Sequence, residues 1–300
     1  MHPHAVVSSG ARPTSVVEPS WGPVEGLELA TLIGPDEGSM HMQIGHSVLQ
    51  PDGFVSGHLH AFEESFYILS GEIWLRMLGR DVVLTTGDFG VVPLGVPHSW
   101  RNASDTPARW LRIRAPQPRD VNDPTQGTYL CRGFDLPHEA TRPAFGLPSV
   151  RHLGHFADDQ MPPAGPVAIR GTNNYAVKNI SLRLMVDDTV GAIHHVAFVG
   201  QMAAGKKVAA DVPPPHYHAF EETYYFVGGT ARGVLEGKEY DIVAGDVAFA
   251  GVNATHGFTP TSSEPLRWIE IMAPRPPSQD SMMFVNQWQA LADSAREGTF

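Results

Sequence analysis

The chain has 300 residues, of which 42% are hydrophobic and 18% charged, values that suit a globular protein with room for two domains. Its formal net charge is −11 and no run of lysine and arginine interrupts that acidity, which argues against a nucleic-acid-binding surface. The N-terminus has no signal-peptide pattern, no apolar run would span a bilayer, and the single Cys131 cannot form an internal disulfide. We therefore expect a cytoplasmic protein with no nucleic-acid and no membrane partner.

Strand signals dominate the first half of the chain. The run Ser65–Leu69 is aromatic and β-branched and is followed by Gly71, and Trp110–Ile113 alternates in the same way. Glycine and proline recur about every ten residues between such runs, the spacing of an all-β sandwich or barrel. We therefore predict an all-β fold.

Four candidate metal ligands accompany these strands. Side chains alternate between the two faces of a strand, so His58, His60 and Glu64 share one face if the strand continues. His98 follows Glu64 by 34 residues, an interval that a short meander of strands would fill while it returns the fourth ligand to the others. Three imidazoles and one carboxylate suit a divalent first-row transition metal and leave coordination positions open.

The same four residue types return in the second half of the chain. Each lies 158 positions after its counterpart, and the second set is His216, His218, Glu222 and His256. Such a gapless repeat indicates a tandem duplication of one domain. We therefore predict one metal site in each copy.

The boundary between the copies is predicted from composition. Prolines punctuate a stretch of weak periodicity near 140–160, so we divide the chain into domains 1–145 and 146–300. Helical periodicity is convincing only near the C-terminus, where we predict one short amphipathic helix on the positions Met283, Val285, Trp288, Leu291 and Ala292.

The ligands belong to two longer patterns. The first half reads His58-x-His60-x3-Glu64-x6-Gly71, followed by Gly87-x5-Pro93-x-Gly95-x2-His98-x3-Asn102. Apart from a leading glycine, this resembles both motifs of the cupin superfamily. The second half keeps all four ligands but has Gly251, Asn253 and Pro260 at the motif's proline, glycine and asparagine. Asparagine accepts the positive φ that a glycine turn often needs. The resemblance implies a bicupin: two tandem jelly-roll (double-stranded β-helix) barrels, each with a metal site.

The activity that this resemblance implies is metal-dependent oxidation. The first motif and its continuation Phe66–Gly71 look most like the quercetinase-like dioxygenase branch. We therefore expect an enzyme that uses iron, manganese, nickel or copper, one ion per domain, and dioxygen to cleave a small aromatic, flavonoid-like or enolic substrate. The ligands Glu64 and Glu222 are the candidate catalytic bases.

Other functions remain open, because the same ligand pattern serves many reactions. One alternative is a metal-dependent isomerase, lyase or decarboxylase that needs no net oxidation. An oxalate decarboxylase is disfavoured, since Val55 and Pro213 stand where that family places an arginine. A further alternative is a non-catalytic cupin that binds a small molecule. A homodimer is also open, although two fused barrels can satisfy the same contact internally.

Side chains near the ligands carry expectations of their own. The parity of the strands predicts Glu63 and Glu221 on the outer face, in salt bridges or at a subunit contact. We also favour an exterior face for Arg112 and Arg114, which the second half replaces by Glu270 and Met272; on a pocket face they would give the two sites different substrate charge preferences. Barrel core is the favoured place for Phe62, Phe66, Phe220, Tyr224, Trp110 and Trp268, and supporting contacts to the ligands are a weaker expectation for His41, His46, His194 and His195.

Overall fold

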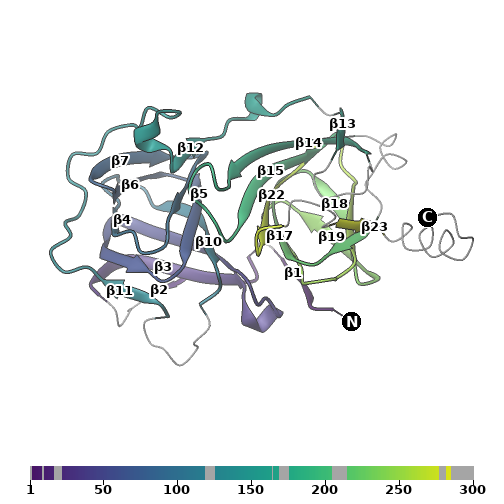
Figure 1. Cartoon of the computed structure of the whole chain (residues 1–300), viewed down its shortest axis with the longest axis horizontal. Helices are drawn as coiled ribbons and strands as arrows, with labels where there is room; N and C mark the ends of the chain where they lie inside the picture. The colour runs from purple at the N-terminus through teal and green to yellow at the C-terminus, as the bar shows by residue number, and fades with distance from the viewer. Residues whose placement is uncertain are drawn as a thin grey trace, which may run out of the picture.

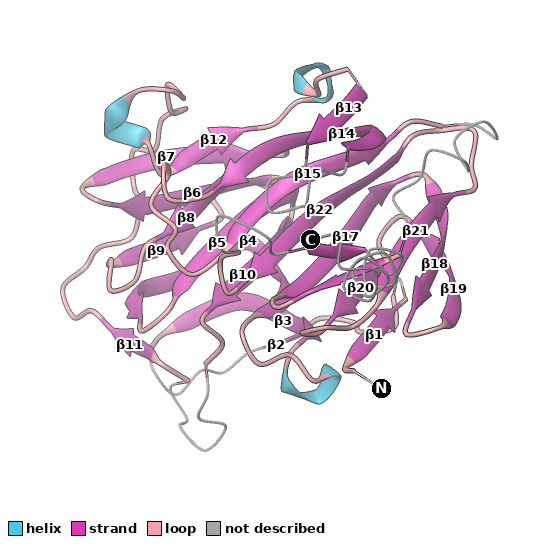
Figure 2. Ribbon diagram, turned by 45° about the vertical axis from the view of Figure 1, so that its right-hand side comes forward, coloured by secondary structure: helices cyan, strands magenta, loops and turns pink. Residues whose placement is uncertain are grey.

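The computed structural model describes residues 2–8, 10–16, 22–118, 126–163, 165–168, 176–204, 215–276 and 282–284. In these residues the chain is almost entirely β, as predicted, with three short 3-10 turns, η1 (Pro35–Glu37), η2 (Pro148–Val150) and η3 (Asp158–Gln160). Figure 2 shows curled sheets of strands with these turns at their margins. The predicted C-terminal helix falls mostly outside the described residues; of its positions, Met283 lies in a strand. No helix in the described part of the chain is long and apolar enough to cross a membrane.

The first barrel is a single antiparallel sheet that curls on itself. Its central path runs β12-β8-β5-β10-β4-β9-β6-β7. The long strand β4 serves both walls, because it pairs with β10 through residues 43–49 and with β9 through Phe54, Val55 and His58. The strands are β2 (Ser15–Val16), β3 (Val24–Ile33), β4 (Gln43–His60), β5 (Glu63–Ser70), β6 (Glu72–Met77), β7 (Arg80–Thr85), β8 (Asp88–Val92), β9 (His98–Arg101), β10 (Ala108–Ala115), β11 (Thr128–Leu130) and β12 (Leu153–His155).

The second barrel repeats this plan in two sheets. One has the order β1-β20-β17-β22-β15-β14-β13 and the other β19-β18-β21-β16-β23. Figure 1 shows the two barrels side by side, the first in purple to teal and the second mainly in teal-green to yellow, with the purple strand β1 at its edge. The strands are β1 (His4–Val7), β13 (Gly165–Ala168), β14 (Ala176–Val186), β15 (Val196–Met202), β16 (His216–His218), β17 (Glu221–Gly228), β18 (Thr230–Leu235), β19 (Lys238–Val243), β20 (Val247–Ala250), β21 (His256–Pro260), β22 (Leu266–Ala273) and β23 (Met282–Phe284).

The apolar side chains on the two faces of the strands pack into three clusters. One fills the first barrel around Trp100 and Trp110, and a second fills the other barrel around Phe226 and Trp268. The third lies between the barrels and joins the outer faces of both, with members such as Ile44, Ile113, Val199 and Ile271. Both faces of the central strands are therefore buried, one inside a barrel and the other against its neighbour.

The two halves exchange strands. β1 precedes the first barrel in the chain but pairs with β20 of the second, in the register His4↔Ala250 to Val7↔Val247. β12 precedes the second barrel but pairs with β8 of the first. The division after residue 145 stays a prediction, and each predicted domain contributes one strand to the sheet of the other.

Two glutamates fasten the barrels together in a reciprocal way. Glu63 accepts hydrogen bonds from the backbone N–H groups of Ile193 (2.7 Å) and His194 (3.1 Å). Glu221 accepts them from Met40 (2.7 Å) and His41 (3.1 Å). Both glutamates are 1% exposed, on the outer face of their barrels as the strand parity predicts, at a contact between the two halves of one chain.

Candidate metal centres

Neighbouring strands bring the three predicted histidine ligands of the first barrel together. His58 and His60 end β4, His98 begins β9, and His58 and His98 are direct cross-strand partners. The turn before His98 is held against β4, because the N–H of Gly95 donates to the carbonyl of His60 at 2.9 Å. Gly95 has a φ of 74°. The second half makes the same bond from Asn253 to His218 at 2.8 Å, with a φ of 61° at Asn253. This confirms that asparagine replaces glycine in the turn.

Each imidazole of the first cluster is anchored through Nδ1. The Nδ1 atoms of His58 and His98 hydrogen-bond the carbonyls of Ser56 (2.7 Å) and Val96 (3.2 Å). His60 Nδ1 contacts the hydroxyl of Thr128 at 3.0 Å. Such contacts fix the ring orientation and leave Nε2 to face the centre of the cluster. Thr128 on β11 lies outside both sequence motifs, so no spacing signal could have identified it.

The chemistry of the first cluster fits a metal ion. One ligand atom from each histidine lies within 4.8 Å of the others, and the three rings are buried. Burial, with added repulsion from neighbouring imidazoles, lowers the pKa of His58 and His60 well below the ordinary value, which favours the neutral form that ligates metals. The Nε2 atoms of His60 and His98 are buried and make no hydrogen bond in the described part of the chain. A shared ion would satisfy both.

The second cluster contains all four predicted ligands. His216, His218, Glu222 and His256 are buried and bring their ligand atoms within 4.8 Å of one another. Glu222 Oε2 lies 2.9 Å from His218 Nε2 and 3.0 Å from His256 Nε2. Burial opposes ionisation of Glu222, yet the two imidazoles hold its pKa well below the ordinary value. Its other oxygen, Oε1, is buried without a hydrogen bond among the described residues.

The two carboxylates are oriented differently. Glu64 Oε2 is 3.6 Å from His60 Nε2, but it accepts a hydrogen bond from Arg114 Nε at 3.1 Å. The first cluster that shares ligand atoms therefore consists of three histidines without Glu64. In the second half, Met272 stands at the position of Arg114, and Glu222 contacts the histidines instead. That these eight residues bind metal stays a prediction, and both groups have the residues to do so.

The exterior face favoured for Arg112 and Arg114 is wrong. Both arginines share the inward face of β10 with Trp110, which stacks on Trp100 inside the barrel at 5.5 Å between centroids. Arg112 is 5% exposed, and burial together with the charge of Arg114 lowers its pKa to about 9. Arginine seldom lies inside a barrel, which is why the sequence pattern favoured the outside.

An acid occupies the corresponding place in the second barrel. Glu270 lies at the position of Arg112, is 6% exposed and accepts a hydrogen bond from Trp268 Nε1 at 2.8 Å. Burial and the charge of Glu222 raise its pKa well above the ordinary value, which favours the neutral carboxyl. The two centres therefore differ in the groups beside them: two guanidinium groups flank the first, and a carboxyl group with a raised pKa flanks the second.

The aromatic residues near the ligands divide between the core and the sites. Phe62 stacks on His60 at 4.4 Å between centroids, and Phe220 stacks on His218 at 3.8 Å. Tyr224 donates a hydrogen bond to Glu222, a contact that Phe66 cannot make in the first barrel. Phe66 packs edge-on against Trp100 in the core.

The four histidines expected to support the ligands lie elsewhere. His46 contacts Tyr225 across the barrels, and His195 contacts Glu63 and Ser65. The backbone N–H groups of His41 and His194 donate to Glu221 and Glu63. In the described residues none of the four hydrogen-bonds a predicted ligand, so they belong to the contact between the barrels.

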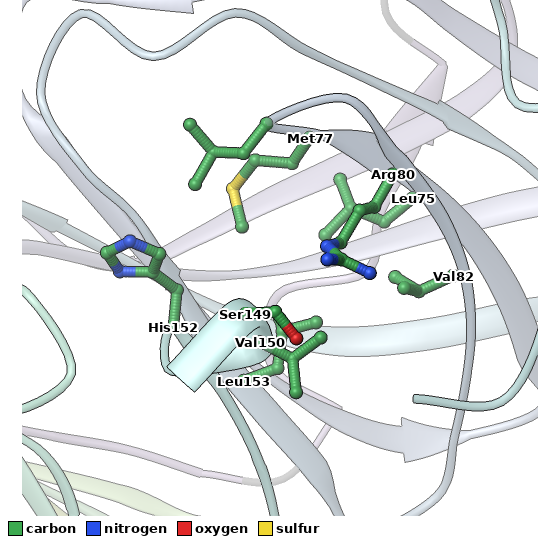
Figure 3. A pocket seen from close by; sticks show the side chains of 9 residues that line it. Leu75, Met77, Arg80, Val82, Ser149, Val150, His152 and Leu153 are labelled. Carbon is green, nitrogen blue, oxygen red and sulfur yellow. The ribbon is translucent and has the colours of Figure 1, made fainter. Parts of the chain in front are cut away.

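A small pocket opens outside the metal centres (Figure 3). It lies where β6 and β7 face η2 and β12, and its lining is mainly apolar, with Arg80, Ser149 and His152 as the polar members. None of the eight predicted ligands lines it.

Comparisons with known proteins agree with this architecture. The sequence profile described as the cupin domain matches residues 45–114 and 207–272. No curated protein sequence matched the chain.

Solved structures of similar fold span most of the chain. A variant of oxalate decarboxylase from Bacillus subtilis aligns with a TM-score of 0.62 and 14% identity over 97% of this chain and 83% of its own. Oxalate decarboxylase from Lactobacillus farciminis, in a formate complex, aligns with a TM-score of 0.62 and 17% identity over 95% of this chain and 90% of its own. A salicylate 1,2-dioxygenase variant from Pseudoaminobacter salicylatoxidans, in complex with gentisate, aligns with a TM-score of 0.61 and 16% identity over 82% of this chain and 74% of its own. At these identities the likeness is one of fold.

Proposed function

Because the chain belongs to the cupin superfamily and is a bicupin, we propose that it is a metal-dependent dioxygenase that cleaves a small aromatic, flavonoid-like or enolic substrate. The observation that carries this proposal is the convergence of three buried imidazoles in each barrel. In the first barrel burial also lowers the pKa of His58 and His60 well below the ordinary value. Such a set binds a divalent transition metal and leaves coordination positions for other ligands.

Residues of each barrel would hold the metal ion and accept the substrate proton. His58, His60 and His98 would hold the first ion, and His216, His218, Glu222 and His256 the second. A bound iron, manganese, nickel or copper ion would supply a Lewis acid for an anionic substrate oxygen and a place for dioxygen beside it. Burial of both centres excludes bulk water, and a carboxylate beside the histidines would accept the substrate proton: Glu222 at Oε1 and Glu64 in the first barrel.

A second candidate function is favoured by the acid pair of the second barrel. The imidazoles lower the pKa of Glu222 while burial and Glu222 raise that of the neighbouring Glu270, and two carboxyl groups with pKa values shifted in opposite directions support proton transfer. The corresponding proposal is a metal-dependent isomerase, lyase or decarboxylase reaction at that centre, with no net oxidation.

Metal content and oxygen uptake test these proposals. We expect close to two equivalents of transition metal per chain by elemental mass spectrometry of untagged protein, and about one in His60→Ala or His218→Ala. Oxygen consumption with flavonols and small enols would support the dioxygenase, and turnover without it would support the second candidate. Absence of tightly bound metal after reconstitution would contradict both and leave a binding protein.

A further inference from the structure

The inner face of β10 presents two positive charges to the first metal centre. Arg112 and Arg114 extend from the same face of this strand, and Glu64 on the neighbouring strand lies directly opposite Arg114. Arg114 also lies over the ring of Phe62, with its guanidinium carbon 5.1 Å from the centroid, and Phe62 in turn stacks on His60. The guanidinium of Arg114, the ring of Phe62 and the imidazole of His60 thus form one continuous stack.

The described residues provide one carboxylate, Glu64, for these two positive charges. Arg114 pairs with Glu64, which is a predicted metal ligand, and has only the amide oxygen of Gln43 besides, at 3.4 Å. Arg112 is buried and has no hydrogen bond or ion pair with any described residue. A buried guanidinium without a carboxylate is costly, and an anion that enters the site would remove this cost.

The second centre offers no comparable charge. Its counterparts on β22 are Glu270 and Met272, and Glu270 is already bonded to Trp268. The duplication thus supplies an internal comparison, in which the same fold position carries a cation in one barrel and an acid in the other.

We propose that Arg112 and Arg114 make the first centre a receptor for small organic carboxylates, a feature that the second centre, with Glu270 and Met272 at these positions, does not share. The planar guanidinium of arginine matches a carboxylate with two parallel hydrogen bonds, and such charged bonds are stronger than neutral ones. This inference rests on the proposed function, because it names the substrate class of one of its two sites.

Calorimetric titration of the metal-reconstituted protein tests the inference without turnover. The probes are benzoate and its uncharged isostere benzamide. We expect benzoate to bind more tightly, and Arg114→Met, which installs the residue of the second barrel, to weaken benzoate binding about 10- to 100-fold with little effect on benzamide. Arg112→Met should do the same, and Arg112→Lys should retain part of the selectivity. Met272→Leu is the matched control and should bind both probes as the wild type does.

Stability provides a second measurement. Removal of a buried charge that no described residue pairs should leave the melting temperature of Arg112→Met unchanged or raise it, whereas a structural role for this arginine would lower it. Equal binding of the two probes, or wild-type selectivity in both arginine variants, would overturn the inference. Selective benzoate binding in a protein that consumes no dioxygen would contradict the proposed reaction alone, and oxygen consumption without selectivity would contradict this inference alone.

Discussion

Single residues show how the protein uses neighbouring positions for different purposes. Glu64 and Glu222 face the histidine clusters, whereas Glu63 and Glu221, one position earlier, face the other barrel. A strand alternates its side chains, so one residue of displacement moves a carboxylate from the site to the interface. The contribution of Glu64 or Glu222 to metal affinity then depends on which side chains contact its carboxylate.

Glu222 should matter more for metal affinity than Glu64. Glu222 contacts two ligand imidazoles, while Glu64 is engaged by Arg114. We expect Glu222→Gln to weaken metal binding at the second centre about 10-fold or more, and Glu64→Gln to weaken it less at the first. Chelator competition checks this, with His60→Ala or His218→Ala disabling the other centre. Equal losses would contradict the difference in orientation.

His46 should make stability depend on pH. Burial and the charge of Arg109 lower its pKa from 6.5 to about 4, so the folded protein binds this proton less readily than the unfolded chain. Stability from this group is complete above pH 6.5 and is lost as the pH falls toward 4, by about 2 kcal/mol between pH 7.5 and pH 5. Urea denaturation of His46→Gln should show a correspondingly smaller loss than the wild type, and the exposed His138→Gln should not.

At the residue scale the sequence predicted the outward glutamates, and the structure brings together seven of the eight predicted ligands, with Glu64 bonded to Arg114 instead. That these residues bind metal stays a prediction. The sequence failed for Arg112 and Arg114, because alternation alone does not say which of the two faces is inside. Their shared parity with Trp110 points inward in the structure, and the cost of burying arginine favoured the opposite assignment. The contact between Arg114 and Glu64 joins residues 50 positions apart and leaves no local signal.

Whole elements show the effect of strand exchange. β1 and β12 are short. β1 extends a sheet of the second barrel, and β12 extends the sheet of the first. Val7 on β1 belongs to the apolar cluster between the barrels and is 8% exposed. The β1 strand thus contributes to stability as part of the core.

Val7→Asp should destabilise the protein by more than about 2 kcal/mol, because it places an unpaired carboxylate in that cluster. Val16→Asp is the control: Val16 lies in the equally short β2 but is 75% exposed, so its substitution should change stability by less than about 0.5 kcal/mol. Urea denaturation measures both. Similar midpoints for the two variants would show that β1 is not tightly packed.

Elements were predictable where a periodic signal was local. Short strands and the turns at Gly95 and Asn253 followed from residue type. The partners of β1 and β12 did not, because pairing across 240 residues depends on which edges remain open after each barrel has formed. The predicted C-terminal helix stays a prediction.

The whole molecule consists of two barrels joined through their outer faces. The barrels share an apolar cluster and two clamps, which are the hydrogen bonds that the buried Glu63 and Glu221 accept from backbone N–H groups of the other barrel. Neither barrel has these contacts alone. Internal duplication could be read from the sequence, but its consequence, an approximately symmetric contact within one chain, needed the structure.

Removal of a clamp should weaken the coupling of the barrels. Glu63→Ala or Glu221→Ala leaves buried N–H donors without an acceptor and should lower the free energy of unfolding by about 3 kcal/mol. Differential scanning calorimetry should then show two transitions in place of one. Glu239→Ala removes an exposed ion pair with Arg232 and should leave the profile unchanged. Single transitions in both clamp variants would show that the apolar contact alone couples the barrels.

The pairing of β1 with β20 also sets an order of events during synthesis. A ribosome that adds about 5 to 20 residues per second needs about 12 to 50 seconds to advance from β1 to β20. β12 follows its partner β8 after only about a quarter of that interval. The first barrel can therefore close while β1 still lacks its partner β20. Of the described strands, β1 is therefore synthesised before the others but is among the last to find its partner.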